Sequence, residues 1–305
     1  METKLLLAPM AGYSDVGFRV VCAQLGADLT FTEMLSAQAM KYDSEKTKAL
    51  AFRDAREKAV VAQIFGKDVQ AMAEAMQNPI LQNFEGIDIN MGCPAPKIVK
   101  NGEGSALLKN LSLASQIITE CKKYAGRRSL SVKVRLGFSE NNIVEIAKMC
   151  EESGADFITV HGRTAKQMYA GKADYEAIAA AKASVKIPVF GNGDIVDEQS
   201  YQNMLLCGVD GVMIGRGAVG SPWLFSELKH EKLSMGKFEA IKTHVEVLRQ
   251  FYPERFLILH LRKHFLAYAA KLHAPSSVKQ KFALQTNIDE SLNLFQSLVN
   301  HFENN

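Results

Sequence analysis

Eight short apolar runs alternate with segments of helix-forming composition, and this alternation constrains the fold more than any other feature of the chain. The runs cover residues 5–10, 29–34, 59–66, 86–93, 130–136, 157–163, 187–193 and 211–217. Strict alternation of strand and helix predicts a parallel sheet. Eight units favour a closed (β/α)8 TIM barrel in the α/β class, with an open doubly wound sheet as the alternative.

The pattern changes after Trp223. Residues 238–252, 255–272 and 289–302 have Leu and aromatic side chains at three- to four-residue spacing, which predicts amphipathic helices. A barrel takes about 250 residues, so we expect a barrel domain over residues 1–228 and a small all-α helical bundle over residues 229–305.

Neither export nor membrane insertion is expected. No apolar stretch approaches the roughly 20 residues that a membrane span needs, and the run at residues 5–10 is too short for a signal-peptide core. The five cysteines are scattered and odd in number, which favours a reduced cytoplasm. Nothing indicates an obligate protein partner.

Polar side chains occur at the ends of several predicted strands, where TIM barrels carry their chemistry. Asp88 and Asn90 share one strand face, and Lys133 and Arg135 share another, because strand side chains alternate. A hydrogen-bonded layer or salt bridge inside the barrel is the expected role of Asp88. Lys133 and Arg135 need negatively charged partners, since buried charges are costly unless paired. The same end also carries Gln63, His161 and Arg163.

Glycine-rich turns follow the last two predicted strands, at Gly191–Asp194 and Gly215–Gly217. Such turns expose backbone N–H groups, and the loops after the last two strands of a barrel often bind phosphate. Arg216 would add a charged contact, whereas the Asp194 side chain is expected to cap the following helix.

An apolar segment, Pro9-Met10-Ala11, follows the first strand and suits a flat ring system. A flavin mononucleotide (FMN) accounts for this wall, the phosphate turns and a cation at barrel depth together. Lys133 is the candidate for the charge near flavin N1, and Gln63 can hydrogen-bond the ring edge.

Cys93 lies between Gly92 and Pro94 directly after the fourth strand, which predicts an exposed thiol. No second cysteine or histidine lies at ligand spacing from it, so no metal site is expected. The other four cysteines lie in or beside helical patterns and are expected to fill space.

Several segments, in order between residues 8 and 218, closely resemble the tRNA-dihydrouridine synthase family, in particular its bacterial branch with a helical C-terminal domain. They are APMAGYSD, AQIFG, GIDINMGCPAPKI with GEGSALL, VKVRLG, VHGRTAKQMYAGKADY, GNGDI and GVMIGRGA. The resemblance implies FMN-dependent reduction of the uracil C5=C6 bond in the tRNA D-loop, with NADPH, or alternatively NADH, as reductant. It implies Cys93 as the acid, and FMN held by Pro9, Met10, Ala11, Gln63, Lys133, His161, Asn192, Gly193, Asp194, Gly215 and Arg216.

Hydride transfer from flavin N5 to uracil C6 leaves negative charge that must be quenched by a proton at C5. A free thiol has a pKa of about 8.5, so it is protonated at neutral pH and still releases its proton readily. From strand-face geometry, Asn90 is expected to hold the uracil edge and Arg135 to contact the base or the RNA backbone.

No acidic residue lies between Arg255 and Ile288. A basic, acid-free helical segment suits tRNA phosphates, although a solvated helical face explains a bias of this size equally well. The expected phosphate ligands are Arg255, Arg262, Lys263, Lys271, Lys279 and Lys281.

Three rival functions remain at this stage. A flavin barrel could act on a free pyrimidine, as dihydroorotate and dihydropyrimidine dehydrogenases do, but it would need no basic helical domain. A non-catalytic tRNA-binding protein could retain the barrel as a scaffold. A non-redox isomerase or aldolase would explain the phosphate turns but not Cys93.

Overall fold

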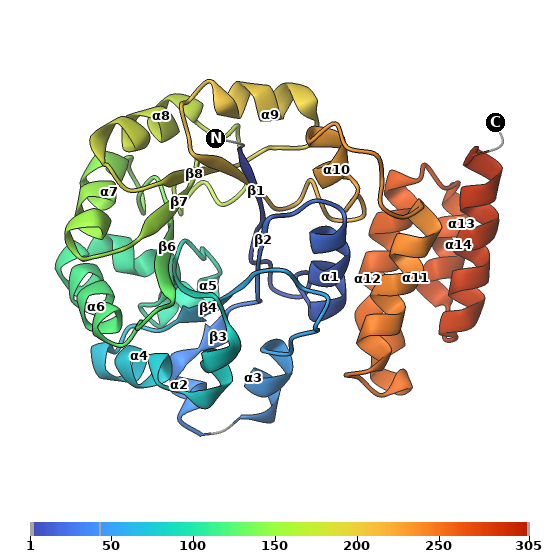
Figure 1. Cartoon of the computed structure of the whole chain (residues 1–305), viewed down its shortest axis with the longest axis horizontal. Helices are drawn as coiled ribbons and strands as arrows, with labels where there is room; N and C mark the ends of the chain where they lie inside the picture. The colour runs from blue at the N-terminus through green and yellow to red at the C-terminus, as the bar shows by residue number, and fades with distance from the viewer. Residues whose placement is uncertain (1–2, 43, 304–305) are drawn as a thin grey trace.

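The computed structural model describes residues 3–42 and 44–303 and contains a closed parallel barrel (Figure 1). All eight predicted strands are present, which confirms the TIM barrel. They are β1 Lys4–Leu7, β2 Leu29–Phe31, β4 Val60–Phe65, β5 Gly86–Met91, β6 Ser129–Arg135, β7 Phe157–His161, β8 Val189–Asn192 and β9 Gly211–Ile214.

Pairing of β1 with both β2 and β9, together with pairing of β2 with β4, closes the ring. The register aligns Lys133 of β6 with Asn90 of β5 on one side and with Thr159 of β7 on the other. A further strand, β3 Leu35–Ser36, extends the edge of β4. Two residues are too few to produce a periodic pattern, so the sequence did not predict it.

Helices surround the barrel, as each βαβ connection requires. Gly154 and Gly208 lie just beyond the C-caps of α7 and α9, with φ of +95° and +71°, a backbone region that favours glycine. The barrel helices are α1 Val16–Gln24, α2 Ala37–Met40, α3 Glu45–Leu50, α4 Val69–Met76, α5 Pro96–Lys100, α6 Leu111–Lys123, α7 Ile143–Glu152, α8 Tyr175–Ser184, α9 Glu198–Leu205 and α10 Leu224–Leu228.

Four helices beyond Gly236 pack together beside α1 (Figure 1). They are α11 Lys237–Arg249, α12 Glu254–Lys271, α13 Ser276–Leu284 and α14 Ile288–Glu303. The sequence predicted all but α13, a short helix whose only buried residue is Phe282. In the described part of the chain, no helix is long and apolar enough to cross a membrane.

Helix α1 joins the two parts because it is buried on both faces. Phe18 and Cys22 belong to the barrel core, whereas Val16, Val20 and Val21 pack in the core of the four-helix part. Gly17 permits the close approach, since a Cβ there would lie 2.6 Å from the backbone oxygen of His244 on α11.

Candidate active site

A hydrogen-bonded polar layer spans β4, β5 and β6 inside the barrel. The Asn90 amide donates to Gln63 Oε1 at 2.8 Å, and Gln63 Nε2 donates to Asp88 Oδ2 at 2.7 Å. The Ser131 hydroxyl donates to the other Asp88 oxygen at 2.6 Å. Burial raises the pKa of Asp88 to about 6 despite these bonds. The expected structural role of Asp88 is thus confirmed.

Lys133 lies next to this layer and points toward β8. Its Nζ donates to Asn192 Oδ1 at 3.0 Å, while the Asn192 amide donates to the Met213 carbonyl at 2.7 Å. Burial, followed by the charge of Arg135, lowers the pKa of Lys133 to about 8. An anion at this point would recover part of the lost stabilisation of the ammonium group.

His161 is a neutral ring at the end of β7. Burial lowers its pKa to about 2, and the neighbouring cations Lys133, Arg135 and Arg163 add to the effect. The ring therefore offers one hydrogen-bond donor and one acceptor at neutral pH, and its Nε2 lies 3.4 Å from Arg163 Nη1.

The loop that carries Cys93 is held from both sides. The side-chain oxygen of Asn90 accepts the backbone N–H of Cys93 at 2.9 Å, and the Cys93 carbonyl accepts the N–H of Ser105 at 3.0 Å. Gly104, with φ of +58°, packs so closely that a Cβ would lie 2.9 Å from the Cys93 carbonyl oxygen. The thiol is partly exposed.

Arg135 has its hydrogen bonds inside the protein. Its guanidinium donates to the backbone oxygens of Gly92 at 2.8 Å, Thr164 at 2.9 Å and Met168 at 2.7 Å. The side chain is 2% exposed. Backbone carbonyls are thus the partners of Arg135, where the sequence had predicted an anion. Through these bonds, Arg135 connects the Cys93 loop to the loop after β7.

The glycine turns after β8 and β9 pack against each other. A Cβ at Gly217 would lie 2.0 Å from the Ile195 oxygen, so only glycine fits there. The prediction that Asp194 caps the next helix is wrong, because Asp197 accepts the Ser200 N–H as the cap of α9. Asp194 instead accepts from Arg163 at 2.6 Å and from Arg216 at 3.2 Å.

The segment after β1 forms one side of the barrel mouth. Pro9 and Met10 are partly buried and Ala11 is exposed. The Gly12 N–H donates to Glu33, a buried carboxylate whose pKa burial raises. Lys263 of α12 lies above this loop, with Nζ 3.0 Å from the position of a Gly12 Cβ.

The other basic residues of the helical part differ in accessibility. Arg262 donates to the Gln285 carbonyl at 3.3 Å and is partly buried, as is Lys279. Arg255, Lys271 and Lys281 are exposed. Lys263 is therefore the predicted phosphate ligand that contacts the rim of the barrel.

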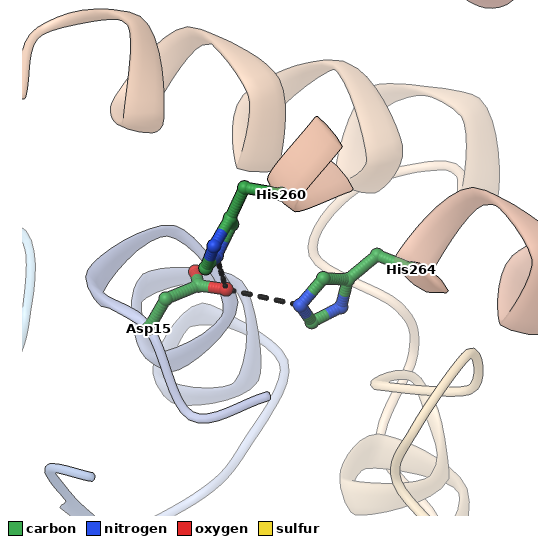
Figure 2. Close-up of side chains that lie close together, drawn as sticks. All are labelled: Asp15, His260 and His264. Carbon is green, nitrogen blue, oxygen red and sulfur yellow. Dashed lines mark hydrogen bonds and ion pairs between the residues drawn. The ribbon is translucent and has the colours of Figure 1, made fainter. Parts of the chain in front are cut away.

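A second cluster, unforeseen in the sequence, joins α1 to the helical part (Figure 2). Asp15 is 4% exposed, and His244, His260 and His264 surround it with nitrogen–oxygen distances of 3.1, 3.0 and 3.0 Å. Burial would raise the pKa of Asp15, but the facing histidines hold it well below its usual value. Attraction to His244 and His264 is the largest cause of the lowering, followed by the hydrogen bonds of Asp15 with His244 and His260.

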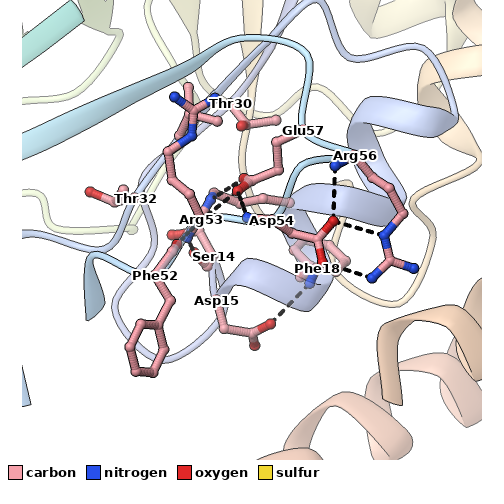
Figure 3. Close-up of polar contacts among 12 residues, drawn as sticks. Ser14, Asp15, Phe18, Thr30, Thr32, Phe52, Arg53, Asp54, Arg56 and Glu57 are labelled. Atoms are coloured by element: carbon pink, nitrogen blue, oxygen red, sulfur yellow. Dashed lines mark hydrogen bonds and ion pairs between the residues drawn. The ribbon is translucent and has the colours of Figure 1, made fainter. Parts of the chain in front are cut away.

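A buried ion pair fixes the loop before β4 against α1. Arg19 Nε lies 2.7 Å from Glu57 Oε1, and the two side chains are 1% and 0% exposed. Arg19 also donates to the Ser14 and Phe52 carbonyls. Glu57 accepts the Asp54 N–H at 3.1 Å (Figure 3). The sequence reasoning did not single out this pair.

Two further residues near the site, Thr159 and Tyr169, were missed in the sequence. The Thr159 hydroxyl is buried and has no hydrogen-bond partner in the described part of the chain. Tyr169 is 55% exposed, and its ring lies 4.7 Å from the Arg216 guanidinium and 5.5 Å from that of Arg135. Alternation along β7 could have revealed Thr159, but only the fold brings Tyr169 to the two arginines.

A closed parallel barrel with Lys133, His161, Cys93 and two glycine turns at the carboxyl ends of its strands defines a TIM-barrel enzyme. One solved structure of similar fold is a variant of NCR from Zymomonas mobilis, with a TM-score of 0.54 and 15% identity over 82% of this chain and 91% of that chain.

Sequence comparison gives the family. The model of the dihydrouridine synthase (Dus) family matches residues 6–303. The tRNA-dihydrouridine synthase B of Pseudomonas aeruginosa is 35% identical over 92% of this chain and 88% of its own length. The corresponding protein of Pasteurella multocida is 35% identical over 98% and 94%. The chain belongs to the dihydrouridine synthase family, whose members are flavin-dependent oxidoreductases.

Proposed function

We propose that this chain is a tRNA-dihydrouridine synthase that binds FMN, takes electrons from NADPH and reduces the C5=C6 bond of a D-loop uridine. The observation that carries the proposal is that Lys133, His161 and Cys93, whose backbone Asn90 holds, lie together at one end of a barrel of this family. The reduced, tRNA-containing cytoplasm is the proposed location.

The residues present fit FMN. The buried Thr159 hydroxyl has no hydrogen-bond partner among the described residues, and Thr159 pairs with Lys133 in the register of β6 and β7. The neutral His161 ring offers both a donor and an acceptor. We assign the flavin ring to Pro9, Met10, Ala11, Gln63, Lys133 and His161, and the phosphate to Asn192, Gly193, Asp194, Gly215 and Arg216. Asp194 would act there through its N–H and by orienting Arg216, since its carboxylate already holds two arginines.

Bound FMN would supply the hydride for uracil C6, and this chain supplies the proton for C5. The Cys93 thiol donates it, so the product gains one hydride and one proton and the thiolate is reprotonated from solvent. We assign the uracil edge to Asn90. Arg135 would contact the base or the RNA backbone through Nη2, because its Nε and Nη1 donate to backbone carbonyls.

A uridine within folded tRNA must be turned out of its stack to enter a barrel. We propose that residues 229–305 form a tRNA-binding part, distinct from the catalytic residues 1–228, and that its cations hold the phosphates. These cations are Arg255, Arg262, Lys263, Lys271, Lys279 and Lys281.

The test incubates purified protein with NADPH and unmodified tRNA and maps dihydrouridine along the tRNA, with Cys93→Ala as the control. We expect a yellow protein and dihydrouridine confined to the D-loop. Bound FMN with reduction of free uracil or orotate, but not of tRNA, would favour the free-pyrimidine reading. A colourless protein that binds tRNA would favour the non-catalytic one.

A further inference from the structure

Asp15 lies at the boundary between the barrel and the helical part and is held in one orientation. As the N-cap of α1, its Oδ1 accepts the Phe18 N–H at 2.9 Å, and His244 Nε2 lies 3.1 Å from the same oxygen. His244 is itself fixed, because its Nδ1 lies 3.0 Å from the Tyr268 hydroxyl. These contacts fix the orientation of the carboxylate, and therefore the position of its second oxygen, Oδ2.

Two histidines of α12 face that oxygen (Figure 2). His260 and His264 are four residues apart, so they share one face of the helix. The Nε2 atom of each lies 3.0 Å from Asp15 Oδ2. The ligand atoms of Asp15, His260 and His264 all lie within 4.8 Å of one another.

His264 is buried without satisfying its ring nitrogens. It is 0% exposed, and neither Nδ1 nor Nε2 has a hydrogen-bond partner among the described residues. Its Nε2 is near Asp15 Oδ2 but is not aligned for a hydrogen bond. A buried polar atom without a partner is costly, and a cation between this nitrogen and Asp15 Oδ2 would give Nε2 a partner.

The donor set suits a divalent transition metal. Two imidazoles at i and i+4 of a helix with one carboxylate are typical zinc ligands. Bonds of about 2.0–2.1 Å place two tetrahedral ligands about 3.3 Å apart, close to the 3.0 Å separations seen here. His244 and the Phe18 N–H hold the outer carboxylate oxygen, as partners of metal ligands do. The His260 side chain is 23% exposed, which leaves access for water as a fourth ligand.

We propose that Asp15, His260 and His264 form a binding site for one Zn²⁺-class ion that fastens α12 to α1. The site goes beyond the proposed function and does not depend on it. Lys263 lies between the two histidines in sequence and reaches the rim at Gly12. The bound metal would therefore hold this cation at the barrel mouth.

The test uses the purified protein, with any flavin that it carries, after treatment with EDTA and dialysis, and titrates it with Co²⁺ and then Zn²⁺. We expect one Co²⁺ per chain with the visible absorption of a tetrahedral site, displacement by Zn²⁺, and a higher unfolding temperature with either metal. Absence of both the absorption and the temperature rise would overturn the proposal.

Variants localise the ion. His260→Ala removes a partly exposed ligand, so the fold should persist, and metal affinity should fall by more than about 100-fold, beyond the usual effect of changing an outer partner. Affinity in His273→Asn, at an exposed histidine of the same helical part, and in Cys93→Ala should match that of the unchanged protein. Equal affinity in His260→Ala, or loss in Cys93→Ala, would refute the site.

Discussion

The side-chain oxygen of Asn90 accepts the backbone N–H of Cys93 at 2.9 Å, so the last inward residue of β5 holds the backbone of the cysteine three residues later. The same oxygen lies 3.2 Å from the Gly92 N–H. The Asn90 amide also donates to Gln63, which couples the Cys93 loop to the polar layer of the barrel.

Replacing Asn90 by Ala should misplace the acid without removing it. We expect dihydrouridine formation to slow by about 100-fold, the usual effect of a displacement near 1 Å. Asn90→Asp keeps the acceptor and should slow the reaction less. Single-turnover reduction of tRNA measures this effect, with flavin affinity as the control. An unchanged rate in Asn90→Ala would show that the loop holds its position without this bond.

Cys93→Ala should slow tRNA reduction by about 100- to 10,000-fold, the range for loss of a general acid. Oxidation of NADPH by the flavin should be unaffected, because that step needs no proton at C5. Cys207→Ala, at another partly buried thiol, is the matched control. Both half-reactions are followed by flavin absorbance, and equal tRNA rates in the two variants would exclude Cys93 as the acid.

The pKa of Lys133, lowered to about 8 by burial, predicts how flavin affinity depends on pH. Below this value the ammonium can donate to the flavin. As pH rises through 8 the free protein loses this proton, so FMN affinity should fall by at most about tenfold per pH unit, the limit for one linked proton. Fluorescence titration from acidic to alkaline pH measures it. Lys133→Arg should stay charged and show no such decline.

The exposed cations Arg255, Lys271 and Lys281 should contribute to tRNA affinity through phosphate contacts. Replacing all three by Ala should weaken binding and reduce the magnitude of the salt slope by about 2 to 3, since each phosphate contact contributes roughly 0.7 to 0.9. Flavin binding should not change. The charge-matched control replaces Arg127, Lys148 and Lys186, exposed on the barrel. Equal losses in both variants would indicate only a general effect of net charge.

Glu57→Ala should destabilise the protein by about 3–5 kcal/mol, because it leaves Arg19 buried without a counter-charge. The double variant Arg19→Met/Glu57→Leu should lose less than the sum of the single changes. Urea denaturation of the flavin-loaded protein measures both. Additive losses would show that the ion pair has no energetic coupling.

The sequence was sufficient for the barrel and for most of the strand-end residues. Strand periodicity places Asp88 and Asn90 on one face and Lys133 and Arg135 on another, because side-chain direction along a strand depends only on local geometry. Elements without a clear local pattern escaped prediction, namely β3 and α13. The sequence interpretation assigned the N-cap of α9 to Asp194, whereas Asp197 is the N-cap in the structure.

The sequence by itself determined the fold class, the family and the inward residues of each strand, since these follow from periodicity and motifs. Only the tertiary structure decided what each of these groups contacts. In the tertiary structure, Arg135 has three carbonyl oxygens as partners. The H-x-x-x-H spacing on α12 was visible in the sequence, but only the packing of α1 against α12 places Asp15 next to His260 and His264. The physical reason is that a buried polar group takes its partner from whatever the packing of distant elements brings within about 3 Å, and local sequence does not encode that distance.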